Sequence, residues 1–222
     1  MTGPAAARRK VLVIGIGTGN PGHITVEAIE ALRRLDVVFL PDKGEEKGAL
    51  AALRRDILDR YMEGRPFRTV TFAVPKRRAD GDYGGAVGDW HAAIAVIYEK
   101  MLIEALGEGE TGGLLVWGDP SLYDSTLRIL DRVAAHGRVM PEIEVFAGIT
   151  AVQALTVAHR TTLNDIGRPV TITTGRRLAE DGSGAGATVV MLDGQKAFRD
   201  ADPDLHIWWG AYLGSADEIL VE

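Results

Sequence analysis

The sequence predicts an α/β fold in two closely packed domains, and three observations lead to this prediction. Short apolar segments of strand length alternate with longer amphipathic segments as far as Ile149, a pattern typical of a largely parallel sheet. Beyond Pro169 the strand-like segments follow one another more closely, which favours a second sheet with a mixed or antiparallel part. The length of 222 residues suits one large or two small domains, and no proline-rich linker separates the two regions.

We place the domain boundary between residues 122 and 123, so that the first domain covers residues 10–122 and the second covers residues 123–222. Residues 1–9 are partly basic and are not followed by an apolar segment of secretory length. We therefore expect these nine residues to form a disordered leader.

The elements are predicted from apolar periodicity and from end signals. The helix from Thr25 to Leu35 carries its apolar side chains on one stripe, and Thr25 is a favourable N-cap. Pro41 ends the second strand, and the polar, glycine-rich stretch 76–88 is expected to be a loop. Strands are predicted at 11–14, 37–40, 69–74, 114–116, 143–146, 170–173, 188–192, 206–212 and 218–221, and further helices at 49–61, 90–106, 125–135 and 151–158.

The composition excludes several function classes. The formal net charge of −6 argues against general nucleic-acid binding. The absence of cysteine excludes disulfides and a thiol nucleophile, and it fits a cytoplasmic location. The histidines are scattered without a metal-binding pattern, so we expect no metal site. No apolar run approaches the roughly 20 residues that span a bilayer, so we expect no membrane partner.

A glycine-rich turn follows the first strand. Gly17 to Gly22 matches the pattern G-x-G-x-x-G, which in dinucleotide-binding proteins places a pyrophosphate at a helix N-terminus. The acidic residue expected about 20 positions later is met only loosely by Asp42. Pro21 and the cap at Thr25 also separate the helix from the last glycine. This pattern is therefore compatible both with nucleotide binding and with a tight turn that binds no ligand.

Two further turns follow later strands. Asp119, within Trp117-Gly118-Asp119-Pro120, can accept hydrogen bonds from a ligand or from its own backbone, since Asp-Pro is a common turn pair. Thr150, within Gly148-Ile149-Thr150, can line a ligand site or cap the next helix. Because ligands of parallel sheets collect at the carboxyl ends of the strands, three such turns predict a binding site.

The basic residues fall into groups with different expected roles. Arg176 and Arg177 follow a strand end, where guanidinium groups suit a ligand with several carboxylates. Lys43 lies at the end of the second strand and Lys76–Arg78 in the expected loop, so both groups can help to bind the carboxylates of such a ligand. By contrast, Arg54 and Arg55 are expected to be a solvated helix face. His91, beside Asp89 and Trp90, could act as a proton shuttle, but we expect an exposed helix histidine.

The three turns, in this order, resemble the tetrapyrrole methylases, which are class III methyltransferases that use S-adenosylmethionine. Ala147 stands where the family usually has proline before its third motif. Within the family, the likeness is greatest to the deacetylating precorrin methylases, and we expect the second domain to be incomplete because these proteins usually continue beyond the position of Glu222. The stretches that carry the resemblance are Gly15-x-Gly17-x-Gly19 with Thr25, Trp117–Pro120, Gly148–Ala151, Asp42–Lys47, Thr173–Arg177 and Trp208–Gly214.

The resemblance implies a fold of two αβα domains with S-adenosylmethionine in a cleft between them and S-adenosylhomocysteine as its product. It also implies a homodimer. The residues carried over as cofactor-binding are Thr18, Trp117, Gly118, Asp119, Leu122, Thr150, Ala151, Met191 and Gly210. The residues expected to contact the substrate are Gly15, Gly17, Lys43, Arg176 and Arg177.

The implied reaction is methylation of carbon 1 of precorrin-5 with release of acetate, a step of cobalamin biosynthesis. Acetate release needs a base and a proton donor. Asp42, Glu45, Asp89, His91 and Tyr123 are the candidates, and we select Asp42 first, with Tyr123. Other classes remain open: methylation of another precorrin, a nicotinamide-dependent oxidoreductase that uses the G-x-G-x-x-G match, or a protein that binds a tetrapyrrole or nucleotide without turnover.

Overall fold

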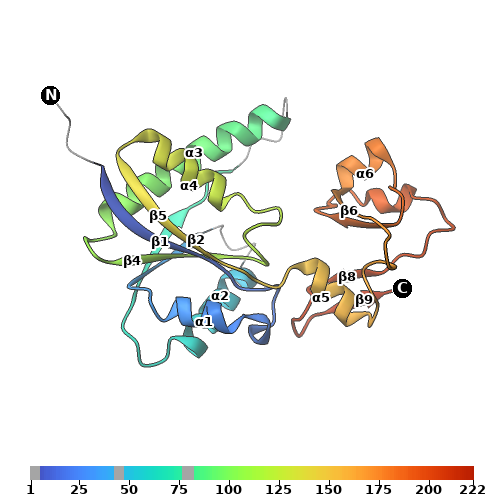
Figure 1. The fold of residues 1–222 in the computed structure, drawn as a ribbon, viewed down its shortest axis with the longest axis horizontal. Coiled ribbons are helices and arrows are strands. Elements are labelled where there is room, and N and C mark those ends of the chain that lie inside the picture. The colour runs from blue at the N-terminus through green and yellow to red at the C-terminus, as the bar shows by residue number, and fades with distance from the viewer. Residues whose placement is uncertain (1–5, 43–47, 77–82) are drawn as a thin grey trace. The chain divides into compact units, whose positions relative to one another are not determined.

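The computed structural model describes residues 6–42, 48–76 and 83–222, without the side chains of residues 48–51 and 83 (Figure 1). The chain divides into two compact units, Met1–Thr150 and Ala151–Glu222. Each unit has its own strands and helices, and they are described in turn.

The first unit is built on a parallel sheet of five strands in the order β3-β2-β4-β1-β5. Each strand is followed along the chain by a helical segment, which is the arrangement that parallel strands require. The strands are β1 (Ala7–Gly15), β2 (Val37–Asp42), β3 (Arg68–Ala73), β4 (Thr111–Val116) and β5 (Val139–Phe146).

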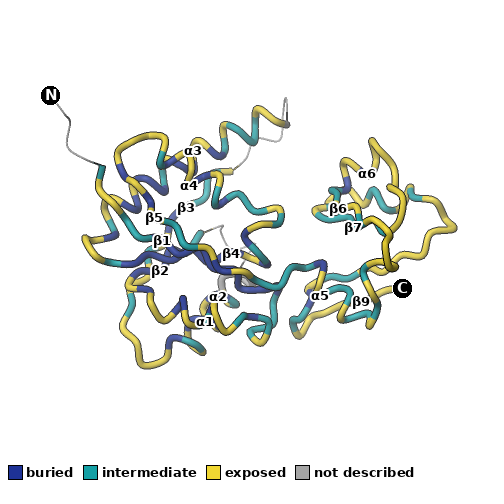
Figure 2. The backbone as a smooth tube through the Cα atoms, viewed as in Figure 1, coloured by how far each residue is buried: buried dark blue, intermediate teal, exposed yellow. Residues whose placement is uncertain are grey.

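Helices cover both faces of this sheet, so the first unit has three layers in the order helices, sheet, helices (Figure 1). Alternate residues of β1 pack on opposite faces of the sheet, because successive side chains of a strand point in opposite directions. Val11 and Val13 pack with α3 (Tyr83–Glu104) and α4 (Thr126–His136), whereas Leu12 and Ile14 pack with α1 (Val26–Leu32) and α2 (Gly48–Tyr61). All four residues are fully buried. Figure 2 colours the backbone by burial and shows the buried residues concentrated in the central strands of the first unit.

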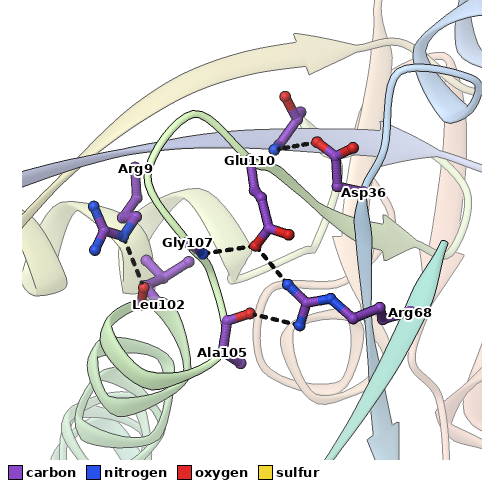
Figure 3. Close-up of polar contacts among 8 residues, drawn as sticks. Arg9, Asp36, Arg68, Leu102, Ala105, Gly107 and Glu110 are labelled. Atoms are coloured by element: carbon purple, nitrogen blue, oxygen red, sulfur yellow. Dashed lines mark hydrogen bonds and ion pairs between the residues drawn. The ribbon is translucent and has the colours of Figure 1, made fainter.

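A polar network fixes the amino-terminal ends of the central strands (Figure 3). The Asp36 carboxylate accepts a hydrogen bond from the Thr111 N–H at 2.8 Å, and the Asp36 N–H donates to the Thr111 carbonyl. Arg68 reaches both the Ala105 carbonyl and the Glu110 carboxylate, which also accepts from the Gly107 N–H. The hydrogen bond from Arg68 lowers the pKa of Glu110, so this loop before β4 is held by an ionised group.

The second unit has smaller sheets. Strands β6 (Val170–Thr174) and β7 (Ala187–Met191) pair in parallel, and β8 (Trp209–Ala211) and β9 (Ile219–Val221) pair antiparallel. The helical segments are α5 (Ala151–Ala158), α6 (Gly175–Asp181) and η3 (Ala197–Asp200). The antiparallel part expected beyond Pro169 is present, but among the described residues it forms a separate two-stranded sheet.

The α/β class and most predicted elements are confirmed, with corrections at four places. Strand β1 begins at Ala7 and pairs with β5 from that residue, so the expected leader is wrong for residues 7–9, and residues 1–5 lie outside the described part. Helix α3 begins at residue 83, inside the expected loop. Residues 175–181 form α6, a helix that the sequence did not predict.

The fourth correction concerns the domain boundary expected between residues 122 and 123. Strand β5 pairs with β1 along its whole length, and α4 packs into the same core as α3. Both elements therefore belong to the first unit, which extends to Thr150.

Within the described ranges, the helices all fall short of the combined length and apolar character that crossing a bilayer requires.

Two glycine substitutions test the packing of the sheet. A Cβ atom at Gly112 would lie 2.6 Å from the Phe39 ring and 3.2 Å from Leu106. We expect Gly112→Ala to lower the free energy of unfolding by about 1–3 kcal/mol, because the core is overpacked. Gly88 in α3 has no atom within 4 Å of the same position, so Gly88→Ala should raise it by about 0.5–1 kcal/mol. Urea unfolding measures both values, and equal effects would contradict the packing described.

Candidate functional site

Three neighbouring strands of the first unit end at the same level. Strand β1 lies between β4 and β5, with Gly15 opposite Val116 and Ile14 opposite Phe146. The carboxyl ends of these three strands therefore lie next to one another. The segments that follow are the three turns selected from the sequence, and the structure brings them together.

The first two turns are joined by backbone hydrogen bonds. The Gly17 N–H donates to the Gly118 carbonyl at 3.2 Å, and the Gly118 N–H donates to the Gly17 carbonyl at 2.8 Å. Both glycines have left-handed backbone angles, with φ of 73° and 69°, which residues with a Cβ rarely adopt. Glycine is therefore required at both positions by the local conformation.

The third turn packs against the other two without room for a side chain. A Cβ atom at Gly148 would lie 2.1 Å from the Gly118 carbonyl oxygen, and one at Gly15 would lie 2.6 Å from the Gly148 nitrogen. A Cβ atom at Gly118 would be 3.8 Å from the Thr150 Cα. Backbone of all three turns is thus in contact, and Asp119 and Thr150 belong to one site.

Asp119 ties the second turn to the third. One carboxylate oxygen accepts hydrogen bonds from the N–H and hydroxyl of Ser121, and the other accepts from the Gly148 N–H at 2.8 Å. Burial by itself raises the pKa of Asp119, but these hydrogen bonds outweigh it and lower the pKa below its usual value. The ionised carboxylate therefore positions both turns.

The other predicted residues of this region surround the turns. The Thr18 side chain is 3% exposed, and its hydroxyl has no hydrogen-bond partner within the described structure. Leu122 is half-buried and its N–H donates to the Asp119 carbonyl. Trp117 and Tyr123 are more exposed, and Tyr123 has a φ of 50°, which is unusual for a bulky residue.

A cavity of about 260 Å³ adjoins the second turn. Trp117 and Tyr123 line one part of it, and Pro41 at the end of β2 lines another. Its remaining walls mix apolar and polar side chains from the sheet, α2, α3 and the start of α4: Phe39, Arg54, Phe72, Val74, Trp90, Ile94, Tyr98, Leu114, Leu115, Val116, Asp124, Ser125, Thr126 and Ile129.

Arg54 is a buried cation in this wall. Its side chain is 8% exposed and its Nε donates to the Leu115 carbonyl at 3.5 Å, so its assignment to a solvated helix face is wrong, whereas Arg55 is exposed as expected. Burial lowers the pKa of Arg54, while Tyr98 and Asp124 act in the opposite direction. Burial also raises the pKa of Tyr98, which stays a neutral phenol.

His91 lies behind the same wall and is 7% exposed, so the expectation of an exposed histidine is wrong. Its Nε2 is 2.9 Å from the Ser125 hydroxyl oxygen. Burial, together with the positive charges of Arg132 and Arg128, lowers the pKa of His91. The imidazole is therefore neutral at pH 7 and can accept a proton.

The remaining predicted residues of the first unit lie at the carboxyl end of β2 or outside the described part. Asp42 is the exposed last residue of β2, next to Pro41 of the cavity wall. Lys43, Glu45, Arg77 and Arg78 lie outside the described residues.

Some of the predicted residues of the second unit lie at the carboxyl ends of β6 and β7. Met191 ends β7 opposite Thr174, which caps α6 by accepting from the Arg177 N–H. Arg176 and Arg177 both bind Glu180 at 2.9 Å, so their charges are already paired on the helix surface. Separately, Gly210 of β8 packs against Leu155, and Ala151 begins α5.

Comparisons with known proteins identify the class to which this fold and site belong. The family profile described as Tetrapyrrole (Corrin/Porphyrin) Methylases matches residues 10–222. The chain belongs to the tetrapyrrole methylases, as the resemblance of its three turns indicated.

Particular relatives narrow the comparison. The chain is 56% identical over 219 residues to precorrin-6A synthase (deacetylating) from Sinorhizobium sp, covering 97% of this chain and 84% of that protein. It is 37% identical, with a TM-score of 0.76, to the cobalamin-synthesis-related protein CobF from Corynebacterium diphtheriae, covering 97% of this chain and 85% of that one. Uroporphyrin-III C-methyltransferase from Thermus thermophilus, crystallised with S-adenosylhomocysteine, shares the fold at 17% identity and a TM-score of 0.57, covering 96% and 82%.

We expect Asp119→Asn to lower the free energy of unfolding at pH 7 by about 1–3 kcal/mol, because an amide cannot accept all of the hydrogen bonds that the carboxylate accepts. The Asp119 pKa is lowered in the folded state, so its contribution is complete above the unfolded pKa of about 3.9 and is lost as the pH falls through the folded value. The difference in the free energy of unfolding between wild type and variant should thus be constant from pH 7 to about 5 and shrink below about pH 4.

Urea unfolding across this pH range measures the difference. The matched control is Glu142→Gln, which removes an exposed ion pair with Arg8 and should change stability by less than about 0.5 kcal/mol. A difference for Asp119→Asn that grows on acidification would contradict the role assigned to the carboxylate.

Proposed function

We propose that this chain is a precorrin-6A synthase: it transfers the methyl group of S-adenosylmethionine to carbon 1 of precorrin-5 and releases acetate, giving precorrin-6A in aerobic cobalamin biosynthesis. The observation that carries the proposal is the 56% identity, over nearly the whole chain, to a relative of that name. The turns and cavity of the first unit supply a site of suitable chemistry.

The residues of the first unit fit the methyl donor. S-adenosylmethionine offers amino, carboxylate, ribose and adenine groups, all of which need hydrogen-bond partners. The Thr18 hydroxyl, which has no hydrogen-bond partner among the described residues, offers one such partner. The N–H groups of Gly17, Gly118 and Gly148 already donate within the three turns, so further partners would come from other groups of these turns. Donor contacts are proposed for Thr18, Trp117, Gly118, Asp119, Leu122 and Thr150, and, on the resemblance alone, for Ala151, Met191 and Gly210 of the second unit.

Catalysis of the methyl transfer is mainly positioning. The bound donor supplies an electrophilic methyl group, and the chain holds the accepting carbon in line with it. Contacts of Gly15 and Gly17 with the macrocycle are proposed on the resemblance alone, since both glycines are buried by neighbouring residues. Arg176 and Arg177 would bind acetate and propionate arms, for which Glu180 is the internal competitor. Lys43 is proposed for the same role.

Acetate release requires proton transfers, for which Tyr123 and Asp42 are proposed. Tyr123 lines the cavity, and Asp42 adjoins it through Pro41. Because both belong to the first unit, the acetyl group of the substrate would enter this cavity beside the second turn.

The nicotinamide alternative is not favoured. Helix α1 begins at Val26, and the Thr25 hydroxyl accepts a hydrogen bond from the Ala28 N–H at 3.1 Å. The last glycine of the G-x-G-x-x-G pattern, Gly22, lies before this cap in the separate turn η1 (Pro21–His23). The helix end that would hold a pyrophosphate is therefore separated from the glycines and partly satisfied by its own cap.

A homodimer in the cytoplasm is proposed on the resemblance to the family. Sedimentation velocity at micromolar concentration measures the oligomeric state directly.

Cofactor binding tests the donor site. We expect calorimetry to detect S-adenosylhomocysteine but not NADH. Thr18→Val should weaken S-adenosylhomocysteine about tenfold, because a buried hydrogen bond to the ligand is lost. Thr188→Val is the matched control, since it removes the other buried threonine hydroxyl without a partner in the described structure, and Thr188 belongs to the second unit. Tight NADH binding would contradict the proposal.

A single-turnover experiment tests Asp42. With precorrin-5 and S-adenosylmethionine, Asp42→Asn should slow acetate release by about 10²-fold, because the proposed base is lost. Mass spectrometry of the tetrapyrrole product and assay of free acetate provide the measurement. Acetate release at the wild-type rate would remove Asp42 from the site.

A further inference from the structure

The deacetylation step needs a nucleophile, and the structure offers one that the turns and the family resemblance do not assign. Ser125 lines the cavity beside the second turn, and its hydroxyl oxygen is 2.9 Å from Nε2 of the buried His91. With the ring proton on Nδ1, Nε2 accepts the proton of the Ser125 hydroxyl. A serine hydroxyl bound to a neutral histidine is the usual arrangement of an activated nucleophile.

A capping role does not account for the Ser125 hydroxyl. Ser125 occupies the N-cap position of α4, where serine usually accepts a hydrogen bond from the first turn of the helix. Its side chain makes no such bond here. The Asp124 carboxylate accepts from the Thr126 N–H instead, at 2.7 Å. The hydroxyl is thus directed to His91 although a capping position was available.

The cavity also provides charge for the reaction. Addition to a carbonyl places negative charge on its oxygen, and a cation in a site of low solvent exposure stabilises that charge strongly. Arg54 is such a cation in the wall of the same cavity. The Asp124 carboxylate in that wall accepts a hydrogen bond from the Thr126 N–H and also interacts with Arg54, so it offsets part of this positive charge.

We propose that Ser125, activated by His91, is the nucleophile that removes the acetyl group from the substrate. This inference rests on the proposed function for its substrate, because the acetyl group belongs to precorrin-5. It goes beyond that function in assigning a covalent acetyl-enzyme.

The first step forms the acetyl-enzyme. The Ser125 oxygen adds to the acetyl carbonyl carbon while its proton passes to His91 Nε2. The bond between that carbon and ring carbon 1 breaks, and its electron pair remains on carbon 1. Carbon 1 then takes the methyl group from the sulfonium donor.

The second step releases acetate. Water adds to the acetyl ester, and its proton passes to Asp42 and then to solvent. The Ser125 oxygen leaves and recovers its proton from His91. Each turnover consumes one water and one S-adenosylmethionine, and it yields methylated tetrapyrrole, acetic acid, S-adenosylhomocysteine and one proton.

The activated ester 4-nitrophenyl acetate tests the nucleophile without the natural substrate. Peptide mapping after brief exposure should find acetyl on Ser125 in the wild type, none there in Ser125→Ala, and acetylation about tenfold or more slower in His91→Gln. Ser183→Ala and His206→Gln, which alter exposed residues of the second unit, are the matched controls and should leave acetylation of Ser125 unchanged. An unmodified Ser125 in the wild type, or equal rates in wild type and His91→Gln, would overturn the proposal.

The natural reaction gives the second readout. In single turnover with precorrin-5, Ser125→Ala should lose acetate release by about 10²-fold or more, while calorimetry shows S-adenosylhomocysteine affinity unchanged, which establishes that the variant is folded. Release by Ser125→Ala at the wild-type rate would overturn this inference and leave the proposed function standing. Absence of both methyl transfer and acetate release in the wild type, with Ser125 still acetylated by the ester, would instead overturn the proposed function.

Discussion

The close approach of three backbone turns is the constraint on which the rest of the first unit depends. Strands β4, β1 and β5 are adjacent, parallel and end at the same level, so the segments that follow must meet. They can meet only because Gly15 and Gly148 have no side chains, and because Gly17 and Gly118 adopt left-handed backbone angles. The Asp119 carboxylate then locks the second and third turns together. The Thr18 hydroxyl is buried beside these turns without a partner among the described residues, and a polar cofactor could bind to it.

The cavity beside these turns combines groups that are costly to bury. Arg54 and Tyr98 line it, and His91 contacts the lining residue Ser125 from behind. All three are nine-tenths buried or more, and each comes from a helix that packs on the sheet. Burial lowers the pKa of His91 and raises that of Tyr98, which keeps both neutral at pH 7. A stable core would be served by apolar residues at these positions. Their polar character is therefore better explained by chemistry in the cavity than by stability.

Local patterns in the sequence predicted much of this structure. The alternation of strands and helices, the Thr25 cap and the three turns were all visible because each depends on neighbouring residues. The resemblance to the tetrapyrrole methylases added the class of protein, which the comparisons confirm. The proposed contacts with cofactor and substrate stay predictions.

What the sequence could not provide depends on long-range pairing. Residues 7–9 look like a charged leader, yet Arg8 pairs with Glu142 once β5 lies beside β1. Arg54 and His91 look like solvated helix residues, and only the packing of their helices against the sheet shows that they are buried. The one available signal was their spacing, since Arg54 lies three residues before Ile57 and His91 three before Ile94, both core positions.

A crystal structure of the protein with S-adenosylhomocysteine tests the central claim most directly. The account predicts that the ligand lies against the backbone of Gly17–Thr18, Trp117–Asp119 and Thr150, with a hydrogen bond to the Thr18 hydroxyl. Density for the ligand elsewhere in the first unit, with these three turns in contact but empty, would contradict it.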